Sequence, residues 1–258
     1  MFRVVIPARY GSARLPGKPL LQLAGRPLLH WVYLRACASA AAAVVVATDD
    51  ERIAVAARGF GAHVVMTAPS HESGTDRIAE VAQAAAWHAH DIVVNLQGDE
   101  PLMPPVLVDQ VAALLAGYAA ADVATLASPI DNLEAQLDPN VVKVVTDLAG
   151  RALYFSRAPI PWSRDGASAG LASQRSFEGA RRHVGLYAYR VAALQRLARL
   201  PPTPLEQQEK LEQLRMLENG LEIRVADALV APGPDVNTSE DLARVKARLK
   251  QQAGGSAP

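Results

Sequence analysis

Three basic residues lie close together in a loop near the start of the chain. Arg9, Arg14 and Lys18 fall within residues 8–20, directly after the apolar run 2–6, which is typical of a buried strand. In open α/β sheets, ligands bind at the loops that follow the carboxyl ends of strands. Arginine side chains and backbone N–H groups can surround phosphate oxygens. The loop therefore predicts a polyphosphate site, with an ordinary solvated surface loop as the alternative.

The loop does not have the spacing of a P-loop. Five residues separate Gly11 from Gly17, and Pro19 follows Lys18 where a P-loop has a hydroxyl residue for magnesium. The sequence also lacks a Gly-x-Gly-x-x-Gly segment that would open a dinucleotide-binding helix. We therefore expect a phosphate loop of another kind.

A carboxylate follows a second apolar run. Asp99 lies just beyond residues 92–96, so we expect it to face the same crevice as the basic loop. Magnesium is commonly held by one or two carboxylates together with phosphate oxygens. Asp99 is therefore predicted to bind a metal, and the alternative is a turn in which its side chain bonds its own backbone.

Two other polar segments are candidates for substrate contacts. Residues 71–77 open a predicted helix, whose N-terminal N–H groups can bind a base edge or a phosphate, although a capping loop explains Ser73 to Asp76 nearly as well. A later set of residues suits an acidic substrate, because arginine can form two parallel hydrogen bonds with a carboxylate. The alternative is a run of solvated charges. This set comprises Arg157, Arg164, Arg181, Arg182, His183 and Tyr187.

Composition limits the classes of partner. The 258 residues include 26 basic and 26 acidic side chains, so the chain has no general attraction for nucleic acid or an anionic membrane. The single cysteine, Cys37, cannot form an internal disulfide, and we expect it to pack in a helix. His88 and His90 are expected to be surface residues rather than metal ligands. The chain shows no signal-peptide core, and we expect a cytoplasmic protein.

The elements that must position these residues alternate along the first part of the chain. Apolar periodicity predicts an α/β fold with a mostly parallel sheet and helices on both faces. Predicted strands cover residues 2–6, 43–48, 63–66, 92–96, 123–127, 141–146, 153–155, 184–189 and 222–225. Predicted helices cover residues 28–39, 51–58, 75–88, 106–117, 205–219 and 239–250, with Thr238 and Asp241 capping the last. Residues 156–182 read as a long polar loop.

Several motifs, in order along nearly the whole chain, resemble those of the 3-deoxy-manno-octulosonate (KDO) cytidylyltransferases, the CMP-KDO synthetases. The first motif alone would indicate only a sugar nucleotidyltransferase, whereas residues 183–190 and 212–213 are similar to the KDO enzymes specifically. The motifs are ARYGSARLPGKPL (8–20), ESGTDR (72–77), NLQGDEP (95–101), SRAPIPW (156–162), HVGLYAYR (183–190) and LEQLR (211–215).

The resemblance implies a Rossmann-like nucleotidyltransferase fold and a homodimer that uses CTP, KDO and Mg²⁺ for lipopolysaccharide synthesis. It implies a nucleotide-binding core (1–130), a sugar-binding and dimerisation subdomain grafted on the same sheet (131–225), a segment returning to the core with a metal ligand (226–250) and a tail (251–258). The implied nucleotide-binding residues are Ala8, Arg9, Gly11, Ser12, Arg14, Lys18, Ser73, Gly74, Arg77, Gln97 and Asp99, of which Arg14, Lys18 and Asp99 are catalytic. The implied sugar-binding residues are Arg157, His183, Tyr187, Glu212 and Gln213.

The chain departs from the family pattern at one metal position. The family commonly has Val-Asp-Thr before its last helix, and this chain reads Asp235-Val236-Asn237-Thr238. The resemblance therefore implies Asn237 as the second metal ligand beside Asp99, because amide oxygens also ligate hard cations. Asp235 is the competing candidate.

The expected reaction is direct transfer of CMP from CTP to KDO, which releases pyrophosphate and requires no covalent intermediate. Two rival hypotheses remain from the sequence. One is another sugar nucleotidyltransferase, such as a CMP-sialate synthetase or a uridylyltransferase, and the other is a non-catalytic nucleotide-binding protein.

Overall fold

The fold is built on one large, mostly parallel sheet. The structure is a computed structural model that describes residues 1–11, 15–167, 169–175 and 177–254. The strands are β1 (Phe2–Ala8), β2 (Gln22–Leu23), β3 (Arg26–Pro27), β4 (Ala43–Thr48), β5 (His63–Met66), β6 (Ile92–Asn95), β7 (Val123–Pro129), β8 (Lys143–Thr146), β9 (Ala152–Ser156), β10 (Arg181–Arg190) and β11 (Ile223–Asp227). The helices are η1 (Lys18–Leu20), α1 (Leu28–Cys37), α2 (Glu51–Gly59), α3 (Gly74–Ala84), α4 (Pro105–Gly117), α5 (Leu133–Leu137), η2 (Leu171–Ser173), α6 (Val191–Leu197), α7 (Pro204–Glu209), α8 (Glu212–Glu218) and α9 (Ser239–Gly254).

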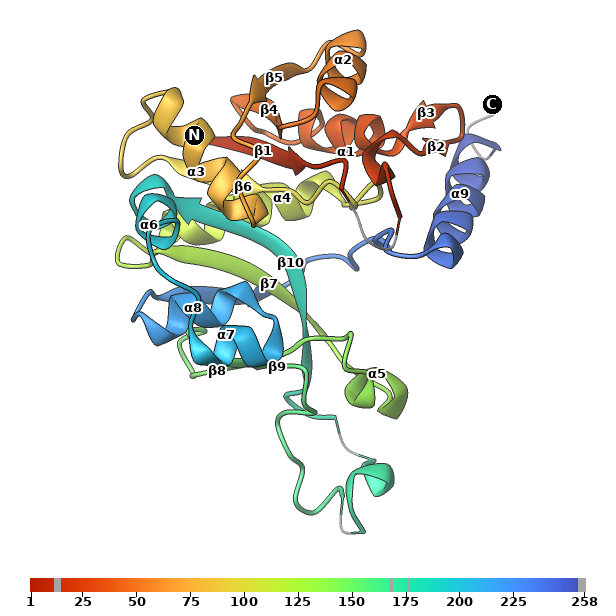
Figure 1. Ribbon diagram of the computed structural model, residues 1–258. Coiled ribbons are helices and arrows are strands. Elements are labelled where there is room, and N and C mark those ends of the chain that lie inside the picture. The colour runs from red at the N-terminus through yellow and green to blue at the C-terminus, as the bar shows by residue number, and fades with distance from the viewer. Residues whose placement is uncertain (12–14, 168, 176, 255–258) are drawn as a thin grey trace.

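The strand order of the main sheet is β11-β7-β10-β6-β1-β4-β5, with β8 and β9 attached beside β10 (Figure 1). β1 pairs in parallel with β4 and β6, so the carboxyl ends of these three strands lie at one edge of the sheet. β10 is antiparallel to both of its neighbours. Its insertion means that the predicted segment 131–225 contributes a central strand to the same sheet as residues 1–130.

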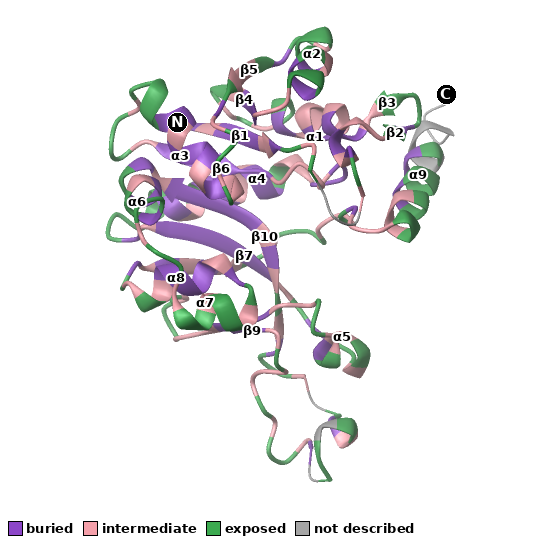
Figure 2. Cartoon of the chain, in the orientation of Figure 1, coloured by how far each residue is buried: buried purple, intermediate pink, exposed green. Residues whose placement is uncertain are grey.

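The hydrophobic core lies on both faces of this sheet, and the central strands are buried (Figure 2). Val4 and Ile6 pack with α1 and α4 on one face, whereas Val5 packs with α3, α6 and α8 on the other, because successive strand residues point to opposite faces. This two-sided burial explains why the strands read as continuous apolar runs. No helix of the described chain is both long and apolar enough to span a bilayer.

The structure corrects some sequence predictions. The helix predicted over residues 205–219 is two helices, α7 and α8, separated at Lys210, which adopts a left-handed conformation with φ 54°. α3 is capped by Ser73 and ends at Ala84, not near residue 88. Cys37, expected to pack, is exposed at the end of α1. β10 begins at Arg181, three residues earlier than predicted.

The predicted long loop is confirmed between β9 and β10, and this segment projects away from the sheet (Figure 1). The capping pair predicted for the last helix is also present, since Thr238 Oγ1 accepts from the Asp241 N–H and Asp241 accepts from the Thr238 N–H. This pair fixes the chain just where it returns to the core.

Candidate functional site

A cavity of about 510 Å³ lies at the carboxyl ends of β1 and β6. It brings together segments that are far apart in the sequence, namely the basic loop, the start of α3, the loop after β6 and the segment before α9. Of the predicted site residues, Ala8, Arg9, Lys18, Ser73, Gly74, Arg77, Gln97, Asp99 and Asn237 line it. Gly11 is not among the lining residues, and Ser12 and Arg14 lie outside the described residues.

Two glycines allow the loops to approach one another at this cavity. A Cβ at position 98 would lie 2.9 Å from the Pro7 carbonyl oxygen, so the loop after β6 can pass β1 this closely only with glycine. Gly17 has φ 68°, a left-handed conformation, immediately before η1 starts at Lys18. The glycines therefore set the positions of Asp99 and Lys18.

The Lys18 ammonium occupies the point where three oxygen atoms from distant segments meet. Its Nζ lies 2.8 Å from Asp99 Oδ2, 2.9 Å from the Val236 carbonyl oxygen and 3.4 Å from Asn237 Oδ1. The Val236 N–H also donates to the Asp99 carbonyl oxygen at 2.9 Å, which ties the two segments together. Residues predicted to hold a metal thus converge on a single cationic group.

These oxygen donors fit a magnesium ion. Carboxylate, amide and carbonyl oxygens are hard ligands, and the ammonium that they already surround is itself a cation. Within the described residues, no group of three or more histidine, cysteine or acidic side chains could hold a metal. Magnesium in proteins commonly keeps several waters and takes further ligands from substrate phosphates.

A second carboxyl beside Asp99 is neutralised by its surroundings. Burial, followed by the charges of Asp99 and Asp235, raises the pKa of Glu100 to about 8, although Arg182 and Lys18 oppose the shift. Glu100 is therefore mostly protonated at neutral pH and adds little negative charge. The sequence analysis gave Glu100 no role, although it directly follows Asp99, whereas Arg182 was among the residues predicted to suit an acidic substrate.

The start of α3 forms one wall of the cavity. Ser73 Oγ accepts from the Asp76 N–H at 3.1 Å, so its hydroxyl serves as the helix cap. Arg77 is buried and is engaged within the protein, with Nη2 3.0 Å from Asp49 Oδ2 and Nη1 against Thr67. The predicted capping loop is thus confirmed, and its residues also line the cavity, whereas contact with a substrate stays a prediction.

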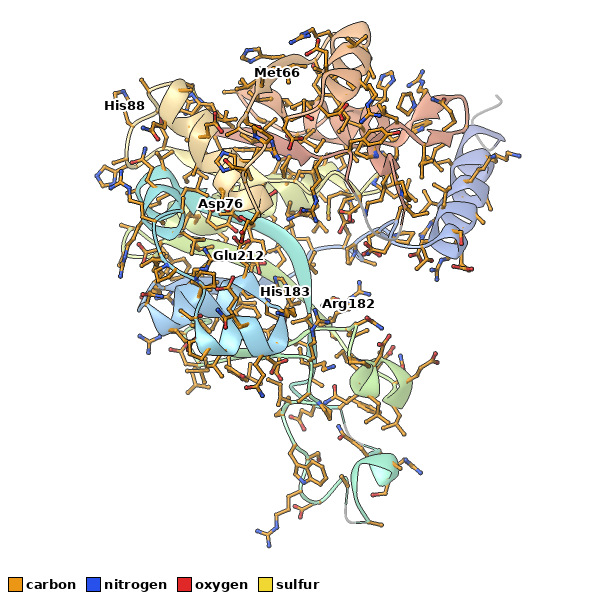
Figure 3. All side chains as sticks on the ribbon, in the orientation of Figure 1. Met66, Asp76, His88, Arg182, His183 and Glu212 are labelled. Atoms are coloured by element: carbon orange, nitrogen blue, oxygen red, sulfur yellow. The ribbon has the colours of Figure 1, made fainter. Side chains whose placement is uncertain are left out.

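A larger cavity of about 1240 Å³ adjoins the first between α3 and the helices α6 to α8. Arg9, His71, Glu72 and Ser73 line both cavities. Glu212 lies in the larger one, near Asp76 (Figure 3).

Glu212 Oε2 accepts from Thr75 Oγ1 at 2.8 Å. Its Oε1 is buried without a partner among the described residues. Burial raises the pKa of Glu212, and hydrogen bonds from Thr75 and Ser73 partly offset this.

The other predicted sugar-binding residues line neither cavity. Arg157 is held by Glu209, whose main-chain oxygen lies 2.6 Å from Nε. His183 and Tyr187 lie on β10 with ring centroids 5.1 Å apart, and the Tyr187 hydroxyl is buried with no hydrogen-bond partner among the described residues. Gln213 is buried in the first turn of α8. Burial raises the pKa of Tyr187, and the charge of the nearby Glu212 also contributes to this rise.

Burial of the His183 ring predicts a pH effect on stability. The half-buried ring packs against Phe155, Tyr187 and Thr125, and loss of solvation, followed by the charge of Arg182, lowers its pKa to about 3. Since the unfolded chain has an ordinary histidine pKa of about 6.5, it binds more protons than the folded protein between pH 6.5 and 3. The free energy of unfolding is therefore expected to fall as the pH drops through this window. Denaturant titrations at a series of pH values should show a shallower dependence in His183→Gln, and equal slopes would contradict the assignment.

Sequence comparisons find relatives that match nearly the whole chain. The cytidylyltransferase family model matches residues 3–223. The 3-deoxy-manno-octulosonate cytidylyltransferase of Thioalkalivibrio sulfidiphilus is 55% identical over 249 residues, covering 96% of this chain and 99% of that protein. The protein of the same name from Pseudomonas syringae pv. syringae is 53% identical, with 96% and 98% covered.

Solved structures are similar as well. A CMP:2-keto-3-deoxy-manno-octonic acid synthetase complexed with CTP superimposes with a TM-score of 0.87 at 43% identity, covering 97% of this chain and 98% of that one. A cytidylyltransferase from Leptospira borgpetersenii has a TM-score of 0.60 at 16% identity and shares the fold alone.

Proposed function

The chain belongs to the cytidylyltransferase family and, within it, to the 3-deoxy-manno-octulosonate cytidylyltransferases, and from this premise we propose that it transfers CMP from CTP to KDO. The products are CMP-KDO and pyrophosphate. The observation that carries the proposal is the 55% identity over 249 residues, which spans nearly the full length of both chains. Convergence of Lys18, Ser73 and Asp99 on one cavity supports it.

The reaction is an in-line displacement at the α-phosphorus of CTP. The anomeric oxygen of KDO forms the new P–O bond, the bond to the β-phosphate oxygen breaks, and the hydroxyl proton is released. Such a transfer depends on positioning and charge neutralisation rather than on a protein nucleophile. The smaller cavity would hold the nucleotide, and the adjoining region near Glu212 would hold the sugar acid.

Asp99 and Asn237 would hold Mg²⁺, together with oxygens of the substrate. When bound, the ion would neutralise phosphate charge and lower the pKa of the attacking hydroxyl. Lys18 would exchange its contact with Asp99 for the triphosphate, because an ammonium binds phosphate oxygens as a point charge. Its place at the junction of the basic loop and Asp99 supports this role.

The proposal further includes a homodimer in the cytoplasm that supplies CMP-KDO for lipopolysaccharide synthesis. The names of the relatives support the pathway. Sedimentation of the purified protein measures the oligomeric state directly.

A panel assay tests the function. Pyrophosphate release is measured with KDO or N-acetylneuraminate as acceptor and CTP or UTP as donor, with magnesium. We expect release with KDO and CTP. Faster release with N-acetylneuraminate or UTP would assign another sugar nucleotidyltransferase, and CTP binding without release for any acceptor would assign a non-catalytic protein.

Glu212 gives a separate prediction for the sugar. Its buried Oε1 can accept a hydrogen bond from a sugar hydroxyl, and removing a hydrogen bond to a charged group costs about 1.5–3 kcal/mol. Glu212→Gln is therefore expected to raise KM for KDO roughly tenfold or more while KM for CTP stays unchanged. Glu134→Gln, an exposed glutamate on α5, is the control. An equal rise in both KM values would indicate a general distortion instead.

A further inference from the structure

Asn237 is the neutral member of the cation site, and its side-chain nitrogen contacts a carboxylate. Its Nδ2 donates to Asp235 Oδ2 at 2.5 Å, while its Oδ1 lies 3.4 Å from the Lys18 ammonium. One amide therefore connects the Asp235 carboxylate to the point where Asp99 and the Val236 carbonyl oxygen meet.

Two contacts of the Asn237 amide within the described residues favour one orientation. In the reverse orientation, Nδ2 would face the Lys18 ammonium, donor against donor. Oδ1 would then face the Asp235 carboxylate, acceptor against acceptor. Only the observed orientation satisfies both contacts, and Asp235 is the acceptor that favours it.

The backbone around Asn237 is fixed from both sides. The Val236 N–H donates to the Asp99 carbonyl oxygen, and the N–H groups of Asn237 and Thr238 donate to Asp241 Oδ2 at 3.0 and 2.9 Å. The backbone therefore fixes the position of this ligand, whereas the orientation of its amide depends on side-chain contacts. The described contacts of Lys18 Nζ do not include Asp235.

We infer that Asp235 is a positioning residue of the cation site: it holds the Asn237 amide oxygen toward the cation and supplies nearby the negative charge that asparagine lacks. The carboxylate also polarises the amide, which makes its oxygen a better ligand for a hard cation. The inference rests on the metal part of the proposed function and adds to it a residue that acts through Asn237.

Binding of Mn²⁺ tests the inference without turnover. The whole protein is incubated with CTP and no KDO, and bound Mn²⁺ is measured by electron paramagnetic resonance. Loss of a residue that orients a metal ligand lowers affinity by roughly 10–100-fold, so Asp235→Ala is expected to bind Mn²⁺ about tenfold more weakly. Asp235→Asn keeps an acceptor oxygen for Asn237 and is expected to lose less.

The double variant separates positioning from direct ligation. In Asp235→Ala/Asn237→Asp, either oxygen of the new carboxylate can face the cation, so affinity is expected to recover. A double variant as weak as Asp235→Ala would make Asp235 itself the ligand and would overturn the inference. Unchanged affinity in Asp235→Ala, or equal losses for Asp235→Ala and Asp235→Asn, would also overturn it.

Asp131→Ala is the matched control, because Asp131 is an exposed aspartate that accepts from the neighbouring Asn132 amide at 2.8 Å, just before α5. It is expected to bind Mn²⁺ like the wild type. A wild-type protein that binds Mn²⁺ normally but releases no pyrophosphate with KDO would reject the proposed reaction and leave the inference standing. Absence of Mn²⁺ binding in the wild type would overturn the inference together with the metal part of the function.

Discussion

Asp99→Asn is expected to lower kcat by roughly a hundredfold or more, the cost of removing one electrostatic contact to the transition state. The substitution keeps the shape of the side chain but removes the carboxylate charge at the point where the loop after β6, the basic loop and the segment before α9 meet. The backbone bond from Val236 to the Asp99 carbonyl oxygen is retained, so the segments stay in place.

Steady-state assays over a range of magnesium concentrations measure this effect, and thermal unfolding checks that the variant folds. Asp131→Asn, the same change at an exposed position, should keep wild-type kinetics. A folded Asp99→Asn enzyme within a few fold of wild type would reject the metal role of Asp99.

Lys18→Ala is expected to lower kcat/KM for CTP by roughly 10–150-fold, corresponding to about 1.5–3 kcal/mol for a lost hydrogen bond to a charged group. KM for KDO should change little, because Lys18 lines the cavity proposed for the nucleotide. Lys246→Ala, an exposed lysine on α9, is the matched control. If the variant lost activity with KDO but kept its CTP kinetics, our assignment of the loop to CTP would be wrong.

The same variant should also change metal binding in the absence of nucleotide. The Lys18 ammonium lies 2.8 Å from Asp99 Oδ2 and therefore competes with any cation for that oxygen. Removing the ammonium leaves the carboxylate available, so Lys18→Ala without CTP is expected to bind Mn²⁺ more tightly than the wild type. Weaker binding would show that Lys18 supports the cation site rather than competing with it.

Local sequence patterns determined the elements and the positions of the loops. The predicted strands over residues 43–48 and 63–66 agree with β4 and β5. Burial on both faces leaves a continuous apolar run in the sequence, and the run ends where polar loop residues begin. The same local information placed Lys18 and Asp99 just beyond buried strands, which is why their convergence could be predicted.

Partners distant in the chain were decided only by tertiary structure. Nothing near β10 in the sequence specifies that it lies antiparallel between β6 and β7, because that place depends on strands from other parts of the chain. The break at Lys210 is of the same kind, since the apolar pattern of residues 205–219 fits a single helix.

The choice between Asp235 and Asn237 as the metal ligand shows most clearly what the sequence alone could not decide. Two residues apart in an extended segment, both could face the metal site by periodicity alone. The contacts of Lys18 with Val236 and Asn237 span more than 200 positions of the chain. In the folded protein the amide oxygen of Asn237 faces the Lys18 ammonium, while Asp235 accepts a hydrogen bond from the amide nitrogen. A sequence pattern specifies which residues can ligate, but which oxygen faces the cation depends on hydrogen bonds that form only after the distant segments have packed together.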